Sequence, residues 1–401
     1  MIISGKLNHI HEVDERKLEL NQVRLSVKRK ANRDVSERPS KIIRTELQKV
    51  EENNLTENDL KSLSMAIYRE RRKRHPTLPK SREDVHTALD GMIIETSKSE
   101  NMCLINDQES GIIIFSCTSN LRVLCTQVEE IFIDGTFKCC AKYFEQLYTA
   151  HGFRNGHYVP LIFALLSSKS EATYTKFLDF VSRLCSERSF TFDPCIVHVH
   201  FEEAMLKCFK QMFPTTEIQC YRFHLDQSWW RKVQKLGLSK EYKEKDCDIG
   251  KWLASFFGLP FLDASDIEEC FVEDLMSDMP ADPRCSLFAD YILKNYIASN
   301  SKFPPNLWAQ LPSLDSKRTT NAAESFHAHY NKQFYAAHPT IFRFWMLSRR
   351  FRLQHTLKLE HCINLLSSDV QRWINLPFRW SNTLNIKTAK YIKANSTRTD
   401  V

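Results

Sequence analysis

The sequence lacks long apolar runs, and this absence argues against two kinds of segment. No stretch of about 18 consecutive apolar residues occurs in the 401 residues, so a membrane-spanning helix is not expected. The first residues, MIISGKLNHIHEVDERK, are polar and lack the apolar centre of a secretory signal peptide. Internal repeats and low-complexity tracts are also absent. With 42% hydrophobic and 26% charged residues, the composition predicts a globular protein that buries a sizeable core.

Cysteine pairs of the CxxC type are absent, although cysteine itself is abundant. The 13 cysteines are odd in number and scattered, and only Cys139 and Cys140 are adjacent. This spacing indicates free thiols in a reducing compartment rather than a disulfide framework.

Positive charge is concentrated at the N-terminus. Residues 1–82 hold 20 lysines and arginines against 12 aspartates and glutamates, a net +8, whereas the remainder holds 36 against 37, a net −1. One interpretation is an arm that binds a polyanion, most plausibly nucleic acid; the other is a solvated helical surface. The basic run at 69–74 supplies four DNA-contact candidates and a weak signal for nuclear location: Arg71, Arg72, Lys73 and Arg74.

Two glycine-free, polar stretches at 12–33 and 41–74 predict helices. The proline- and serine-containing segment HPTLPKSRED then indicates a linker, and a compact domain is expected from about residue 83.

The central part of the chain predicts alternating strands and helices. Short strands are expected at 112–115, 130–137, 144–153 and 158–166, and Asn155-Gly156 between the last two is a strong hairpin signal. Apolar spacing then predicts a helix at 171–187, followed by a strand, helix, strand and helix at 194–200, 201–213, 217–221 and 224–236. From residue 130 onward, the order βββαβαβα, with Asp134 on the first of these strands, describes an α/β (α+β) ribonuclease-H-like fold: a mixed sheet with flanking helices.

The predicted organisation has five parts. They are a basic helical arm, the first part of the core, an acidic helical insertion, a core completion with a helix at 319–334, and a tail: 1–82, 83–237, 238–310, 311–365 and 366–401.

Six segments, in order along the chain, carry a resemblance to a known family. They are IFIDGTFK at 131–138, FEQLYTAHG at 144–152, VPLIFALLSSKSEATY at 159–174, HFEEA at 200–204, YRFHLDQSWWRKVQKLGL at 221–238 and RTTNAAESFH at 318–327. From about residue 9 to about residue 350, the chain resembles Mutator-like (MULE) transposases, especially those with an N-terminal FLYWCH zinc finger.

The resemblance implies cut-and-paste DNA transposition by two-metal chemistry. Two Mg²⁺ or Mn²⁺ ions roughly 3.5–4 Å apart clamp the attacking and leaving oxygens, and such hard ions require carboxylate ligands. The family's first acid corresponds to Asp134 and its last to Glu324. Alone, Asp134-Gly135 also reads as an ordinary turn. The expected partners are transposon ends and target DNA, the expected location is the nucleus, and a homo-oligomer is a further expectation.

The second acid departs from the family pattern, because His200 stands where an aspartate is expected. Imidazole is a poor Mg²⁺ ligand, although Mn²⁺ and Zn²⁺ tolerate it better. Glu202 and Glu203 open the next helix and could reach toward the site, but they point in different directions, so neither replaces His200 directly. Glu202 is therefore a candidate for a group just outside the metal ligands. We therefore expect catalysis to be lost or badly weakened. The alternatives are a domesticated or relic DNA-binding protein without catalysis, and another ribonuclease-H-like nuclease.

Two further departures concern zinc ligands. Tyr221 occupies the family's cysteine position before His224, and Cys220 with His224 alone lacks two ligands for a structural zinc. His9 and His11 match the end of a FLYWCH finger, but its preceding cysteines are absent from this sequence. No complete zinc site is predicted, and His224 is interpreted as structural or as a group just outside the metal ligands.

The remaining candidates lie around the last acid and in the tryptophan pair Trp229-Trp230. His327 shares a helical face with Glu324, so it is either a supporting group or a partly exposed helix residue. Trp229-Trp230 is interpreted as the inward face of an amphipathic helix rather than a base-stacking patch. Phosphate contacts are expected from arginines that follow the last acid: Arg343, Arg349, Arg350 and Arg352.

Overall fold

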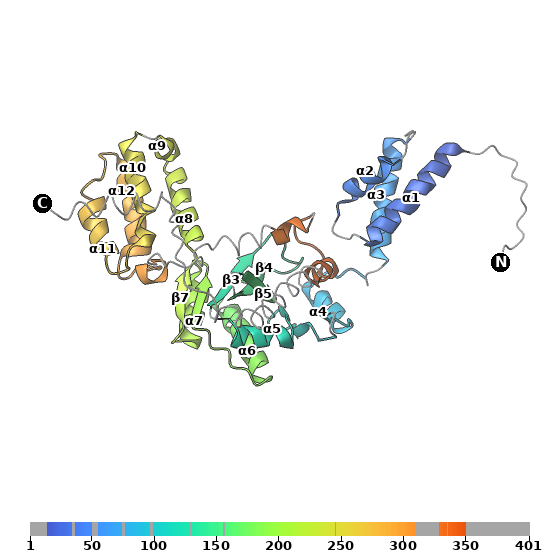
Figure 1. Cartoon of the computed structure of the whole chain (residues 1–401), viewed down its shortest axis with the longest axis horizontal. Helices are drawn as coiled ribbons and strands as arrows, with labels where there is room; N and C mark the ends of the chain where they lie inside the picture. Colours follow the sequence, from blue (N-terminus) through green and yellow to red (C-terminus); the bar gives the residue numbers. More distant parts are fainter. Residues whose placement is uncertain are drawn as a thin grey trace, which may run out of the picture. The chain divides into compact units, whose positions relative to one another are not determined.

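The computed structural model describes ten segments of the chain (Figure 1). They are residues 14–33, 37–49, 55–73, 77–96, 99–128, 130–154, 157–244, 246–309, 329–334 and 336–349. Within these segments, every helix is too short or too polar to cross a membrane.

Three helices form a small bundle at the N-terminus: α1 (Glu15–Arg33), α2 (Pro39–Leu47) and α3 (Glu57–Arg72). Their shared core includes Val27, Ile42 and Leu63, each fully buried. The stretch 41–74, predicted as helical throughout, is divided, because α2 ends at Leu47 and a capping box at Thr56 starts a new helix. The Thr56 hydroxyl accepts from the Asp59 N–H, while the Asp59 carboxylate accepts from the Thr56 N–H at 2.8 Å.

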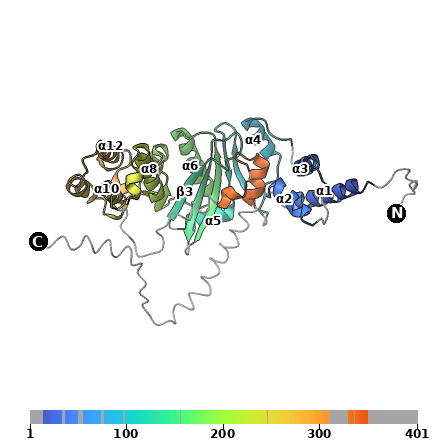
Figure 2. The ribbon, with the colours of Figure 1, turned by 90° about the horizontal axis from the view of Figure 1, so that it is seen from above.

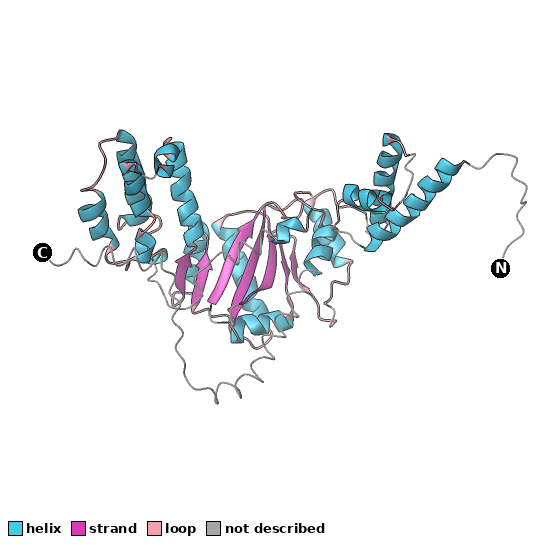
Figure 3. Ribbon diagram, turned by 45° about the horizontal axis from the view of Figure 1, so that its top comes forward, coloured by secondary structure: helices cyan, strands magenta, loops and turns pink. Residues whose placement is uncertain are grey.

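Seven strands form one mixed sheet (Figure 3) in the order β1-β2-β5-β4-β3-β6-β7. Their bounds are β1 Cys103–Asp107, β2 Ile112–Phe115, β3 Glu130–Thr136, β4 Gln146–Arg154, β5 His157–Leu166, β6 Ile196–Val199 and β7 Glu217–Cys220. Neighbours from β1 to β3 pair antiparallel, whereas β3, β6 and β7 run parallel. The predicted strands are confirmed, and β1 is an additional strand that the sequence pattern did not predict.

Helices cover both faces of the sheet, as side-chain alternation along the strands requires. Leu147 and Phe163 face a core shared with α4 (Arg82–Asp90) and the helical residues 341–349, which lie beside that sheet face in Figure 2. Tyr148, the next residue on β4, faces the opposite way and packs on Tyr174 and Phe177 of α6 (Glu171–Ser186). Helices α5 (Thr118–Thr126) and α7 (Glu203–Met212) pack beside α6. This architecture is compatible with a ribonuclease-H-like fold.

Residues 239–309 are helical or irregular wherever the structure describes them. Helix α8 (Arg222–Lys235) leads from the sheet toward α9 (Ser239–Lys243), α10 (Asp248–Phe256), α11 (Ile267–Glu269) and α12 (Pro283–Ile292). Shorter 3-10 or π-helical turns lie at Leu259–Phe261, Cys270–Leu275, Leu293–Ile297 and Pro305–Leu307. Aromatic side chains fill the centre of this unit; Trp252, Phe256 and Phe288, for example, are in mutual edge contact.

Candidate functional site

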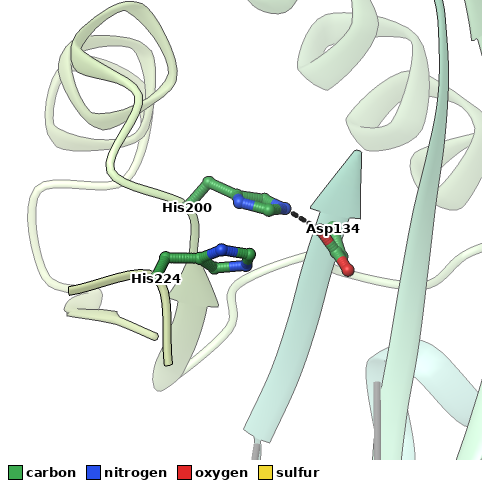
Figure 4. A group of neighbouring side chains, drawn as sticks. All are labelled: Asp134, His200 and His224. Carbon is green, nitrogen blue, oxygen red and sulfur yellow. Dashed lines mark ion pairs between the residues drawn. The ribbon is translucent and has the colours of Figure 1, made fainter. Parts of the chain in front are cut away.

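Three side chains from separate segments converge at one end of the parallel strands (Figure 4). Asp134 lies on β3, His200 directly follows β6, and His224 lies in the first turn of α8, just after β7. The carboxyl ends of parallel strands meet at one sheet edge, where ligand sites of open α/β sheets form. One oxygen or nitrogen ligand atom of each residue lies within 4.8 Å of the other two.

Asp134 is buried, with only 5% of its surface exposed, whereas both histidines are partly exposed. The Asp134 carboxylate forms an ion pair with Nε2 of His200. The two imidazole rings lie against each other, with ring centroids 4.0 Å apart and planes inclined by 35°. The cluster therefore offers two nitrogen ligands and one carboxylate at a partly open edge.

The backbone around Asp134 is held by neighbouring side chains. The Thr149 hydroxyl donates to the Asp134 carbonyl at 3.2 Å, and the Tyr221 hydroxyl donates to the Ile133 carbonyl at 3.2 Å. Tyr221 is buried, and its ring packs edge-on against both His200 and His224. Tyr221 thus ties the end of β7 to β3 and packs against both histidines.

Glu202 lies close to the cluster, but its carboxylate is directed to other groups. Its N–H donates to the His200 carbonyl at 2.7 Å, while its side chain hydrogen-bonds with Tyr174 and raises the pKa of that phenol together with burial. Gln146 donates to the same phenol oxygen at 2.7 Å. Glu203 instead forms ion pairs with Lys207 and Lys302. Neither acid belongs to the Asp134 cluster.

The comparison with family models identifies the region that carries this site. Residues 130–228 match the MULE transposase domain. The match begins with β3 and ends within α8, so it contains all three residues of the cluster. It supports transposase-derived ancestry and, in general terms, a divalent-metal site. The comparison with curated proteins gives no match.

Several predicted residues lie outside the described segments. They are the last acid, its helical neighbour, three basic positions and two finger-remnant histidines: Glu324, His327, Arg74, Arg350, Arg352, His9 and His11. The structure consequently describes Asp134, His200 and His224 as a group, without the expected third acid.

The basic DNA-contact candidates have different environments. Arg72 and Lys73 are exposed at the end of α3, and Arg349 is exposed at the end of helix 341–349, while Arg343 is half-buried. Arg71, by contrast, is buried, and its guanidinium donates to the carbonyls of Glu37 at 2.8 Å and Ala31 at 3.4 Å. Arg71 joins α3 to α1 and is not available to phosphate in this arrangement.

Cys220 remains apart from the metal-ligand group. It is buried at the end of β7, and burial raises the pKa of its thiol to about 12, which opposes the thiolate form that metals bind. Among the described residues, the metal-ligand group that contains His224 does not include Cys220.

A cavity of about 510 Å³ lies along one face of α8 and was not predicted. Phe223, Asp226 and Trp230 line it from α8, and Tyr242 and Phe257 complete its aromatic wall. Trp229 is fully buried, which confirms the inward-facing interpretation for that residue, whereas Trp230 is only half-buried. Burial raises the pKa of Asp226 to about 6.

Proposed function

We propose that this protein is a transposase-derived DNA-binding protein in which metal-dependent strand cleavage is lost or strongly weakened. The observation that carries the proposal is His200, which occupies the place of the second acid and pairs with Asp134. The match to the MULE transposase domain supports the ancestry. A FLYWCH-associated origin is part of the same proposal.

The cluster does not fit a pair of hard metal ions. Two-metal phosphodiester chemistry requires several carboxylates, because Mg²⁺ prefers oxygen ligands and keeps a strict octahedral arrangement. Among the described residues, the cluster contributes one carboxylate and two imidazoles. Replacing an aspartate by a neutral histidine also removes one negative charge where two divalent cations would lie. Asp134 and Glu324 would be the Mg²⁺ or Mn²⁺ ligands of an active form.

DNA binding is proposed from charge and ancestry together. The net charge of +8 in residues 1–82 favours a polyanion, and exposed Arg72 and Lys73 present part of that charge to solvent. Transposon ends or target DNA are the proposed partners. A nuclear location and self-association accompany this proposal.

A cleavage assay tests the loss of activity. The probe is supercoiled plasmid carrying the genomic DNA that flanks the gene, incubated with the full chain and Mg²⁺ or Mn²⁺. We expect little or no nicking by the unmodified protein and measurable nicking by His200→Asp. The matched control is the double variant His200→Asp/Asp134→Asn, which should be inactive.

Two outcomes contradict the proposal at different points. Robust nicking by the unmodified chain overturns the loss of catalysis. A folded His200→Asp variant that shows no nicking contradicts the assignment of that loss to His200. DNA binding is measured separately, as a mobility shift whose log affinity should fall steeply with log salt concentration.

A further inference from the structure

The Asp134 cluster has the composition of a different class of metal site. A carboxylate with two imidazoles suits borderline transition ions such as Zn²⁺, Co²⁺ and Ni²⁺, which accept nitrogen ligands readily. Mg²⁺, by comparison, is usually held by oxygen ligands and water. We propose that Asp134, His200 and His224 form a mononuclear transition-metal site that discriminates against Mg²⁺.

Two of the three ligands lie on regular elements, and the third directly follows a strand. Asp134 lies within β3, which pairs with β4 along its whole length, and His200 follows β6, which pairs with β3 and β7. His224 lies within α8, where its N–H donates to the Tyr221 carbonyl at 3.0 Å. Ligands on strands and helices are held more precisely than ligands on loops, so little ordering remains to be done when a metal binds.

The contacts of His200 Nε2 indicate where a cation fits. This nitrogen faces the Asp134 carboxylate, an acceptor, and also the Gly135 N–H, a donor 3.2 Å away. A protonated Nε2 satisfies the carboxylate and loses the bond from Gly135, whereas an unprotonated Nε2 places two electron-rich atoms together. A divalent cation at this point binds the carboxylate and the lone pair of an unprotonated imidazole, and it takes the place of the Gly135 N–H at Nε2.

The surroundings favour a single ion. Glu202 hydrogen-bonds with Tyr174 through its side chain, and Glu203 is paired with two lysines. Aromatic rings flank the histidines: Tyr221 contacts both, and Phe223 lies edge-on to His224 with centroids 5.4 Å apart. Such a shell orients the ligand rings and limits access of water, which tunes affinity.

This proposal rests on the proposed function in one respect, because it assumes that the site no longer supports Mg²⁺-dependent cleavage. The two remain separable, since metal binding is measured without DNA. A loss of nicking without metal binding would leave the proposed function intact and remove only the transition-metal site.

The test uses metal-free full-length protein and the metal ions alone. Calorimetric titration should give one Zn²⁺ or Co²⁺ per chain and at least about 100-fold weaker binding of Mg²⁺. The absorption spectrum of the Co²⁺ form should lack the thiolate charge-transfer band that cysteine ligands would produce. This readout matters because the chain has 13 cysteines that compete for soft metals.

Substitutions of the two histidines test whether they are the metal ligands. His200→Ala and His224→Ala should each weaken Co²⁺ binding by about 100-fold, a loss at least as large as those of outer-shell changes. His338→Gln, at an exposed histidine outside the cluster, should bind as the unmodified chain does. Circular dichroism verifies that each variant is folded. Unchanged Co²⁺ affinity in folded His200→Ala and His224→Ala, a thiolate spectrum, or equal affinity for Mg²⁺ would overturn the proposal.

Discussion

The backbone N–H of Gly135 lies 3.2 Å from Nε2 of His200, across the two neighbouring parallel strands β3 and β6. This contact links the residue after Asp134 to the imidazole of His200. It depends on close approach at Gly135, where a Cβ atom would lie 2.9 Å from Cε2 of Tyr148. Tyr148 is almost fully buried, so its ring has little room to move.

Gly135→Ala should therefore destabilise the fold and disturb the His200 contact. Forcing an additional methyl group into a packed region typically costs about 1–3 kcal/mol. Urea unfolding measures the loss. Gly91→Ala is the control, because its Cβ would meet nothing closer than 3.9 Å and its φ of −83° suits alanine. Equal unfolding midpoints for the two variants would contradict this account.

Substitutions of Arg71 and of its neighbours Arg72 and Lys73 should have different effects on stability and on DNA binding. Arg71→Met leaves the carbonyls of Ala31 and Glu37 without their charged donor, so we expect a loss of about 2 kcal/mol in unfolding free energy. Arg72→Gln and Lys73→Gln should retain stability and weaken DNA binding. Each lost phosphate contact should reduce the slope of log affinity against log salt by about 1. The opposite pattern, in which only Arg71→Met loses affinity while remaining stable, would refute this division.

The ionisation of Asp226 should make the free energy of unfolding depend on pH. Burial raises the pKa of this carboxyl from 3.8 to about 6, so ionisation disfavours the folded state. The destabilisation begins as the pH rises above 3.8 and is complete above about 6. Asp226→Asn should remove it and stabilise the protein by about 1 kcal/mol at pH 8, a value discounted for partial exposure. The gain should shrink as the pH falls toward 4.

Unfolding free energies at several pH values test this prediction. Asp278→Asn, at an exposed aspartate, serves as the control and should show no such pH dependence. A gain from Asp226→Asn that is constant from pH 5 to pH 8 would exclude titration of this carboxyl as the cause.

Cys125 and Cys185 should be the first thiols to form a disulfide under mild oxidation. Their sulfur atoms lie 3.4 Å apart, between α5 and α6, and their hydrogen bond lowers the pKa of Cys125. The attacking species in such oxidation is the thiolate. Diamide would accept the two electrons and two protons released. Peptide mapping without reductant should detect the link, and Cys125→Ser should abolish it. Preferential linkage of buried Cys139, whose thiol pKa burial raises to about 12, would contradict the prediction.

The strands of the core were predictable because burial leaves a strong signal in sequence. Ile131-Phe132-Ile133 is a continuous apolar run on a central strand, and the hairpin of β4 and β5 pairs from Gln146–Leu166 to Arg154–His157 with one register shift between Ala150 and His151. Strand β1 was missed because all of Cys103–Asp107 is only partly buried. Its apolar run, Cys103-Leu104-Ile105, is short and ends at Asn106-Asp107, so the segment does not stand out from a loop.

The site was only partly predictable for a related reason. The position of Asp134 follows from its strand and the family resemblance, but the approach of His224 depends on where α8 starts after β7, which spacing alone does not determine. The burial of Arg71 could have been predicted from its position on α3, although its charge suggested an exposed residue. It is spaced four residues from Ile67 and eight from Leu63, so it continues the buried face of α3.

Phe201 gives the helical insertion a direct connection to the cluster. The ring of this residue, adjacent to His200 in the chain, packs edge-on against Tyr296 and Phe303, with centroids 6.0 and 5.2 Å away. A ligand that changes the packing of those two rings would therefore change the setting of the neighbouring imidazole. Thermodynamic linkage requires the reverse effect to be equal in free energy. Binding of a metal to the cluster would then change the affinity of the insertion for that ligand. Binding of the ligand would change the affinity of the cluster for the metal by the same factor.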